Sequence, residues 1–343
     1  MMDLLTFGII GVKVVGVLAA VVLAVLVMTY VERRLSAFIQ NRLGPNRVGP
    51  GGVLQPLADG IKFMMKEDLI PAGVDKPVYI MAPAMLLVPA LMTFAVIPFG
   101  STVHLFGRDI PLQVADVNVG ILYILALTSV GVYGIVLAGW SSNSKYPLLG
   151  GLRSAAQMIS YELALGLAVV SVVLLSGSLR LNDMVAAQQG GPFSWNIFKQ
   201  PLAFLIFLVA AYAETNRLPF DLTEAEQELV GGYHTEYSSM KFAMFFLSEY
   251  ANMITASALT VTLFFGGWDI PFVNEARLGN LGGIVSVLVF VIKVALFLFL
   301  YVWVRWTFPR FRYDQLMRLG WKVMLPLALV NILVTGGYLV FRA

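Results

Sequence analysis

Residues 4–31 read LLTFGIIGVKVVGVLAAVVLAVLVMTYV and contain one charged side chain, that of Lys13. A bilayer core about 30 Å thick is crossed by a helix of about 20 apolar residues, so this run predicts a membrane-spanning helix. The run is too long for a cleavable signal peptide, and Asp3 stands before it where a signal peptide has basic residues. We therefore expect it to remain as the first helix.

Seven further apolar runs of comparable length follow along the chain. They are Val78–Phe99, Val117–Trp140, Ser154–Gly177, Pro201–Leu218, Phe242–Trp268, Leu281–Val304 and Val323–Phe341. Of the 343 residues, 59% are apolar and 13% are charged, about half the charged share of a soluble domain. The sequence predicts an all-α polytopic membrane protein, with residues 1–343 forming a single integral membrane domain of about eight transmembrane helices.

Composition also limits the cofactors and ligands that the chain can bind. The chain has no cysteine and only two histidines, which leaves no thiolate for an iron–sulfur cluster and few ligands for haem or zinc, so we expect no metal site. Neither a GxGxxG nor a GxxxxGK[ST] motif is present, so no nucleotide site is indicated. The net charge of +3 is too small and too scattered to predict nucleic-acid binding.

Basic residues indicate the orientation of the helices. Sixteen of the 23 Lys and Arg residues lie in or beside the loops after the first, third, fifth and seventh spans, and five lie on the opposite face. Because cytoplasmic loops carry the excess of Lys and Arg, we expect both termini on the outer, periplasmic side.

The first inner loop combines an irregular stretch with an amphipathic one. The Gly-Pro pairs in residues 32–52, ERRLSAFIQNRLGPNRVGPGG, exclude one long helix. In residues 54–70, LQPLADGIKFMMKEDLI, apolar residues recur at helical spacing with Asp59, Lys62 and Lys66 on the other side. This pattern predicts an amphipathic helix, which lies in the headgroup plane or is an ordinary surface helix.

Ionisable side chains inside apolar spans point to function, because they are costly in lipid. Glu162, Glu214 and Glu249 are the acids in this position, and Lys13 and Lys293 are the bases. A carboxyl group out of water loses the hydration of its charged form, so it can hold and release a proton, and several in series can relay protons. The alternative is that each acid is a structural residue paired with a buried lysine or a backbone donor, but simple pairing of three acids with two lysines leaves at least one acid over.

The third inner loop is acidic, although the inner face is otherwise basic. Residues 216–237, NRLPFDLTEAEQELVGGYHTEY, hold five acids with only Arg217 to offset them: Asp221, Glu224, Glu226, Glu228 and Glu236. A capping box formed by Thr223 and Glu226, together with the helix dipole, accounts for one or two of them. The cluster therefore predicts a proton reservoir or a counter-charge for a basic partner.

Five ordered motifs resemble one family. They are ERRLSAFIQNRLGPNRVGPGG, LQPLADGIK, YELALGL, AETNRLPFDLTEAEQELVGGYHTEY and KFAMFFLSEYANM. The chain resembles, from its first helix to its eighth, the membrane subunit of respiratory complex I that is known as the H subunit in bacteria and as NADH dehydrogenase subunit 1 in mitochondria. The outer segments 180–200 and 269–281 carry no matching motif, and nothing is transferred there.

The resemblance implies a subunit of proton-pumping NADH:quinone oxidoreductase in the bacterial inner membrane, at the junction with the peripheral arm. Quinone is its substrate, ubiquinone or menaquinone, and no cofactor is bound by this chain alone. FMN and iron–sulfur clusters lie on partner subunits. The partners are the peripheral-arm subunits that hold the quinone site and the terminal cluster, neighbouring small membrane subunits, antiporter-like subunits and membrane lipid.

The resemblance also assigns two groups of residues and implies no catalytic residue on this chain, since electron transfer occurs on partner subunits. The proton relay would comprise Glu162, Glu214, Glu224, Glu226, Glu228, Glu236 and Glu249. The quinone chamber would be lined by Glu32, Arg33, Arg42, Asp59, Arg217 and Asp221. Reduction of quinone in the chamber would change the local charge, and the acids would pass this disturbance towards the neighbouring subunits.

Three alternatives remain on the sequence alone. One is the homologous membrane subunit of a related energy-converting hydrogenase, which uses no quinone. Another is a proton-coupled secondary transporter, although we find no internal repeat of the kind such folds carry. A third is an inert membrane anchor for soluble partners, in which neutralising the buried acids has little effect.

Overall fold

The computed structural model describes residues 4–105, 108–222, 229–269 and 280–342. Long helices dominate it, which confirms the predicted all-α membrane fold. The longer helices are α1 (Leu4–Ile39), α2 (Gln55–Met65), α3 (Lys76–Met92), α4 (Gly120–Ser141), α5 (Lys145–Ser176), α8 (Pro201–Glu214), α10 (Ser239–Phe264), α11 (Asn280–Thr307) and α13 (Leu325–Arg342).

Short elements connect them. These are η1 (Pro50–Gly52), η2 (Thr93–Val96), α6 (Leu181–Ala186), η3 (Pro192–Ser194), α7 (Asn196–Lys199), η4 (Gly232–His234), α12 (Tyr313–Arg318) and η6 (Leu319–Met324). Strands β1 (Thr102–Leu105) and β2 (Arg108–Pro111) form an antiparallel hairpin in which Val103 is opposite Ile110.

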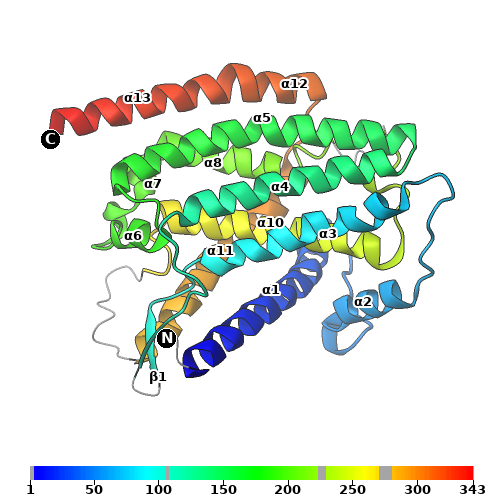
Figure 1. The fold of residues 1–343 in the computed structure, drawn as a ribbon, viewed down its shortest axis with the longest axis horizontal. Coiled ribbons are helices and arrows are strands. Elements are labelled where there is room, and N and C mark those ends of the chain that lie inside the picture. Colours follow the sequence, from blue (N-terminus) through cyan, green and yellow to red (C-terminus); the bar gives the residue numbers. More distant parts are fainter. Residues whose placement is uncertain (1–3, 106–107, 223–228, 270–279, 343) are drawn as a thin grey trace.

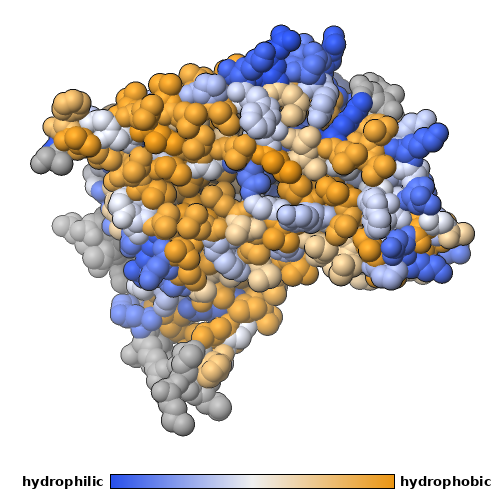
Figure 2. Space-filling model, turned by 45° about the horizontal axis from the view of Figure 1, so that its top comes forward, coloured by the Kyte–Doolittle hydropathy of each residue, from blue (hydrophilic) through white to orange (hydrophobic). Residues whose placement is uncertain are grey.

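The long helices form one bundle (Figure 1). Helices α3, α4, α5 and α8 pack in succession, and α13 lies along α5. Both chain ends lie at the same end of the bundle as the hairpin, and α2 lies near the opposite end. Apolar side chains form a broad belt across the face in Figure 2, with hydrophilic side chains gathered at its margins.

Among the described residues, six helical segments are long and apolar enough to cross a membrane. They correspond to the first four and last two predicted spans: Phe7–Ile39, Lys76–Val96, Gly120–Ser141, Lys145–Ser176, Leu281–Thr307 and Tyr313–Arg342. The fifth span is present as α8, an apolar helix of 14 residues, and the sixth as α10, a helix of 26 residues. That these two also cross the bilayer stays a prediction.

Several helices extend beyond the apolar runs. Helix α1 continues from Val31 to Ile39, and α5 begins at Lys145, before the run that starts at Ser154. Charge ends an apolar run but not a helix, because polar side chains are compatible with helical backbone wherever they find partners. Helix α5 ends at Ser176, and the φ of 68° at Gly177 suits the left-handed position after a helix. The amphipathic helix predicted in the first inner loop is confirmed as α2.

Near the hairpin, an ion pair ties the start of α6 to the segment before α4. Arg180 Nε donates to Asp116 Oδ1 over 2.8 Å. This hydrogen bond, together with the positive charge of Arg180, holds the pKa of Asp116 below its ordinary value. The connection after α5 is thereby fixed to the connection before α4.

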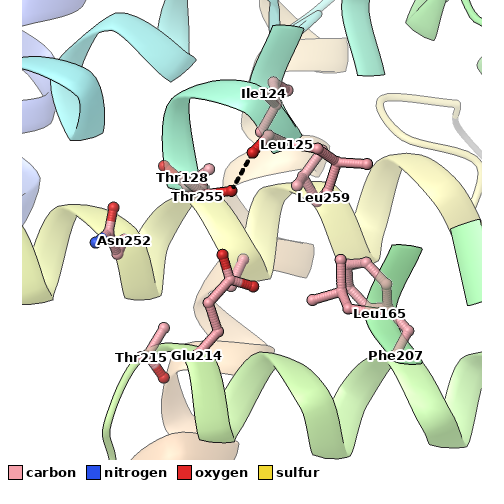
Figure 3. A pocket seen from close by; sticks show the side chains of 11 residues that line it. Ile124, Leu125, Thr128, Leu165, Phe207, Glu214, Thr215, Asn252, Thr255 and Leu259 are labelled. Carbon is pink, nitrogen blue, oxygen red and sulfur yellow. Dashed lines mark hydrogen bonds between the residues drawn. The ribbon is translucent and has the colours of Figure 1, made fainter. Parts of the chain in front are cut away.

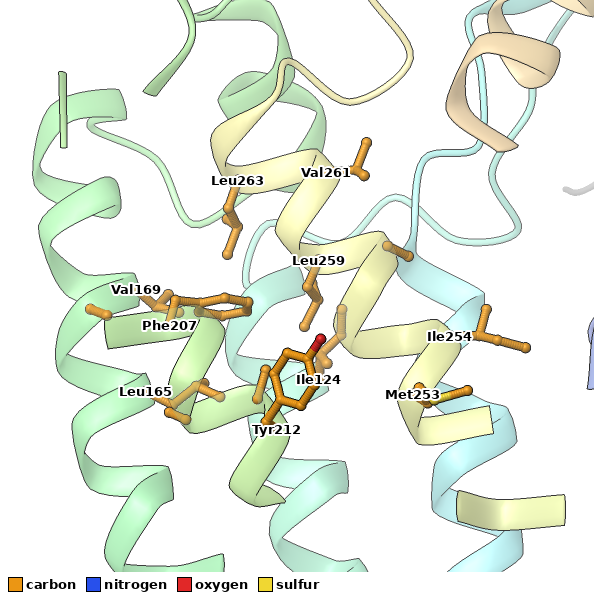
Figure 4. Packing of buried hydrophobic residues seen from close by; sticks show 14 of the residues in the cluster. Ile124, Leu165, Val169, Phe207, Tyr212, Met253, Ile254, Leu259, Val261 and Leu263 are labelled. Atoms are coloured by element: carbon orange, nitrogen blue, oxygen red, sulfur yellow. The ribbon is translucent and has the colours of Figure 1, made fainter. Parts of the chain in front are cut away.

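The core lies where α4, α5, α8 and α10 meet. Figure 4 shows Leu165 and Val169 of α5, Phe207 of α8 and Leu259 of α10 directed towards one another. Close backbone approach supplements this packing. A Cβ atom on Gly150 of α5 would lie 2.8 Å from the Cα atom of Gly232 in η4, which is too close for any side chain. Gly150 therefore sets how closely the third inner loop packs on α5.

We predict that Gly150→Ala destabilises the assembled protein by about 1–3 kcal/mol, because backbone must move to accept the methyl group. Gly166→Ala on the same helix is the matched control, since nothing lies within 4 Å of its Cβ position. Thermal unfolding of the purified complex measures both. Equal midpoints for the two variants would show that the close contact at Gly150 does not constrain the loop.

Candidate functional site

A buried cluster of opposite charges joins three distant parts of the chain. Arg217, in the turn after α8, lies with its Nη1 3.1 Å from Oε1 of Glu32 on α1 and its Nε 2.7 Å from Oε1 of Glu249 on α10. The three side chains are 7–13% exposed. A buried charge is tolerated when it is paired, so one guanidinium serves two carboxylates.

Two further residues complete this cluster. Arg305, near the end of α11, also forms an ion pair with Glu32. The hydroxyl of Tyr250 donates to Oε2 of Glu32 over 2.6 Å, and the guanidinium of Arg217 lies 4.5 Å from the centre of the Tyr250 ring. We call Glu32, Arg217, Glu249, Tyr250 and Arg305 the central cluster. Its two carboxylates and two guanidinium groups balance in charge.

The position of Arg217 follows from a tight turn. Asn216 adopts a φ of 51°, and the amide of Arg217 donates to the carbonyl of Tyr212 over 3.3 Å. Gln157, fully buried on α5, donates from Nε2 to the carbonyl of Ala213 at 2.8 Å and that of Phe220 at 2.9 Å. The two ends of the turn are thus held to α5, as buried carbonyl groups require.

A second pair of acids lies on α5 and at the end of α8. The hydroxyl of Ser129 on α4 donates to Oε1 of Glu162 on α5. The carboxyl group of Glu214, the last residue of α8, lies beside Thr128 of α4 on the wall of one cavity, and the charge of Glu162 acts on it. Within the part of the chain that the structure describes, neither carboxylate forms an ion pair. We call Glu162 and Glu214 the acid pair.

Both members of the acid pair border open space. Glu214 points into a small cavity whose wall includes Thr128 and Thr255 (Figure 3). Glu162 lies in a groove of about 410 Å³ that is also lined by Leu325 and Leu329 of α13. The acid pair is therefore open to the interior at Glu214 and to the groove beside α13 at Glu162.

A family model described as NADH dehydrogenase matches residues 12–336. The chain belongs to the NADH dehydrogenase family. Geobacter sulfurreducens has two similar NADH-quinone oxidoreductase H subunits, numbered 1 and 2. The chain is 54% identical to number 2 over 331 residues, with 96% of each chain covered. It is 57% identical to number 1 over 335 residues, covering 94% of this chain and 93% of the relative. The H subunit of Flavobacterium psychrophilum is 52% identical over 329 residues, covering 95% of each chain.

The structure brings together residues that the resemblance to this family had assigned to separate groups. Glu32 and Arg217 of the expected chamber meet Glu249 of the expected relay in the central cluster. Glu162 and Glu214 of the relay form the acid pair. Glu224, Glu226 and Glu228 lie outside the described residues.

The remaining predicted residues lie apart from both groups. Arg33 on α1 forms an ion pair with Asp59 on α2 at 2.5 Å, which fixes α2 against α1. Arg42 Nε donates to Gln40 Oε1 over 2.6 Å on the surface. Asp221 forms an ion pair with Arg310 at 3.0 Å. The backbone carbonyl of Glu236 accepts a hydrogen bond from Tyr79.

The two membrane lysines bind backbone. Lys13 donates to the carbonyl of Gln113 over 3.1 Å. Lys293 donates to the carbonyls of Phe265, Gly267 and Asp269 at 2.8–2.9 Å, which satisfies acceptors just beyond the end of α10. Among the described residues, no group of three or more His, Asp or Glu side chains is placed to hold a metal ion.

Sequence reasoning missed Arg305, Tyr250 and Ser129. The sequence indicates Arg305 only as a basic residue of the fourth inner loop. It directly follows the apolar run Leu281–Val304, a position from which it can reach a buried acid such as Glu32. Tyr250 is adjacent to Glu249, but adjacent helical residues face different directions, and it contacts Glu32 instead. No signal in the sequence distinguishes Ser129 from other membrane serines.

We predict that Arg217→Gln destabilises the assembled protein by about 3–5 kcal/mol, because it leaves buried carboxylates without their cation. The matched control is Arg33→Gln, which removes an exposed ion pair and should cost about 0–1 kcal/mol. Chemical denaturation of the purified complex, followed by loss of this subunit, measures the difference. A loss of stability no greater for Arg217→Gln than for Arg33→Gln would contradict the structural role of the central cluster.

Proposed function

We propose that this chain is the membrane subunit of a bacterial NADH-quinone oxidoreductase that lines the quinone chamber and couples quinone reduction to proton translocation. The relatives described above are named as H subunits of an enzyme of that kind. The observation that carries the coupling role is the acid pair: two carboxylates at membrane depth, in contact with hydroxyl groups and without a cation among the described residues.

The chamber is proposed at the end of the bundle that holds α2. There, the ion pair between Arg33 and Asp59 holds α2 against α1. The apolar side chains of α2 face outward, with Leu57, Ile61 and Met64 exposed by 53%, 57% and 70%. An apolar surface of this kind suits the isoprenoid tail of a quinone that enters from lipid. The central cluster, at the inner end of α1, supplies the charged groups that respond when quinone is reduced.

Proton coupling follows from the difference between the central cluster and the acid pair. In the central cluster every charge has a partner, so a change of charge in the chamber disturbs a balanced set. The acid pair has no partner cation among the described residues and responds to such a disturbance by taking up or releasing protons. Glu162 borders the groove beside α13, which is the direction in which the proposed relay leaves the subunit.

The partners and location follow from the same assignment. FMN and iron–sulfur clusters are proposed on peripheral-arm subunits, because this chain has no cysteine to hold a cluster. Antiporter-like and small membrane subunits are proposed beside the acid pair. Both chain ends lie at one end of the bundle, which supports an even number of crossings, and the basic loops favour a periplasmic side for both termini in the inner membrane.

We predict that Glu162→Gln and Glu214→Gln each lower proton translocation while the complex still assembles, because an amide keeps the shape of the side chain but cannot carry a proton. Glu67→Gln, at an exposed position of the first inner loop, is the control and should pump normally. Inverted membrane vesicles report proton uptake and quinone reduction together. Normal pumping in both acid-pair variants would exclude a relay through this pair.

A photoactivatable short-chain quinone tests the chamber separately. Applied to the assembled complex during turnover, it is expected to label peptides between residues 32 and 76 or between residues 214 and 236. Excess unlabelled quinone should suppress the labelling. Label confined to partner subunits or to the hairpin end of this chain would contradict the proposed chamber.

A further inference from the structure

The cavity beside Glu214 is the size of a single water molecule. It lies between α4, α5, α8 and α10 and has a volume of about 20 Å³, counted as the space open to the centre of a water molecule (Figure 3). A volume of roughly 10–15 Å³ on this measure is enough for one water, provided that polar groups surround it. Whether water binds therefore depends on the polar groups of the wall.

Apart from Glu214, the wall holds one polar side chain that has no partner among the described residues. The hydroxyl groups on the wall already donate within the protein: Thr128 to Leu125 at 3.0 Å and Thr215 to Ala211 at 2.9 Å. The Thr255 hydroxyl is 3.0 Å from that of Thr93. Asn252 of α10 differs, because its side-chain amide forms no hydrogen bond with any described residue. A partly buried amide without a partner is costly unless water binds it.

Asn252 also lies between the two charged groups. It follows Glu249 by three residues on α10, so the two side chains share one face of the helix about one turn apart. Glu249 belongs to the central cluster, and the cavity that Asn252 lines has Glu214 on its α8 side. The amide thus lies one helical turn from Glu249 and shares a cavity wall with Glu214.

We infer that Asn252 holds one water molecule in this cavity and that this water joins the central cluster to Glu214. The amide Nδ2 donates to the water oxygen, and the water donates to the Glu214 carboxylate. A proton that arrives from the chamber side forms a new O–H bond with the water. One of the water's original O–H bonds then breaks and its proton passes to Glu214, so the water is unchanged after the transfer. Asn252 carries no proton and is a positioning residue.

This inference rests on the proposed relay, but its first test does not. A density map of the wild-type complex that resolves ordered water is expected to show a peak within hydrogen-bond distance of both Asn252 and Glu214. An empty cavity, or an Asn252 side chain bonded to a partner subunit, would overturn the inference and leave the proposed function standing.

The second test is the Asn252→Leu variant, which keeps the side-chain volume and removes both polar atoms. Because the variant loses the hydrogen bond that holds the water beside the Glu214 carboxylate, we expect proton transfer to slow about tenfold. Proton pumping should therefore fall more than quinone reduction. Asn252→Ser, which keeps a hydroxyl towards the cavity, should restore pumping. Ser257→Ala on α10 is the control, because that hydroxyl donates to Met253 of its own helix.

The outcomes separate the two proposals. Pumping that is normal in Asn252→Leu and defective in Glu214→Gln overturns the role of Asn252 and keeps the relay. If Asn252→Leu fails to assemble, the comparison of Asn252→Ser with wild type and the water peak decide the matter. An equal loss in Ser257→Ala would overturn the inference, since the effect would then come from α10 in general.

Discussion

The guanidinium of Arg217 is the point on which the packing of this membrane domain depends. It is buried, and a buried charge without a partner costs several kcal/mol. The helices must therefore pack so that their acidic side chains reach the guanidinium. Glu32 comes from α1 and Glu249 from α10, while Arg305 of α11 neutralises the second charge of the set. In lipid, where burial of apolar surface gives little drive for helices to associate, such polar contacts fix which helices are neighbours.

The same requirement that buried charges be paired distinguishes the acid pair from the central cluster. A domain that satisfies Glu32 and Glu249 with two arginines leaves Glu162 and Glu214 with hydroxyl groups of α4 as their described partners. Packing does not demand carboxylates there, since amides would form comparable hydrogen bonds. On the proposed function, a change of charge at the balanced central cluster would be answered by proton movement at the acid pair.

Much of this fold follows from hydropathy, and much of the site does not. All eight apolar runs contain helices, because lipid requires every backbone group to be satisfied within the segment. The run 201–218 nevertheless contains a helix that ends at Glu214, since Gln157 of α5 stabilises a turn that no local pattern reveals. Glu249 was expected in a relay and Arg217 in a chamber, yet they form one ion pair. The alternative to a relay paired the buried acids with lysines or backbone donors, but arginines pair with Glu32 and Glu249, and the lysines bind carbonyls. Pairing between helices depends on tertiary distance, which sequence spacing does not encode.

Redox-induced infrared difference spectroscopy on the assembled complex detects carboxyl groups as they change protonation, so it can show whether the acid pair responds to quinone reduction. We predict that reduction of quinone changes the absorption of protonated carboxyl groups and that Glu214→Gln removes part of that change. A spectrum without a carboxyl signal, or one that is identical in wild type and variant, would contradict it, because the buried acids would then keep one protonation state throughout turnover.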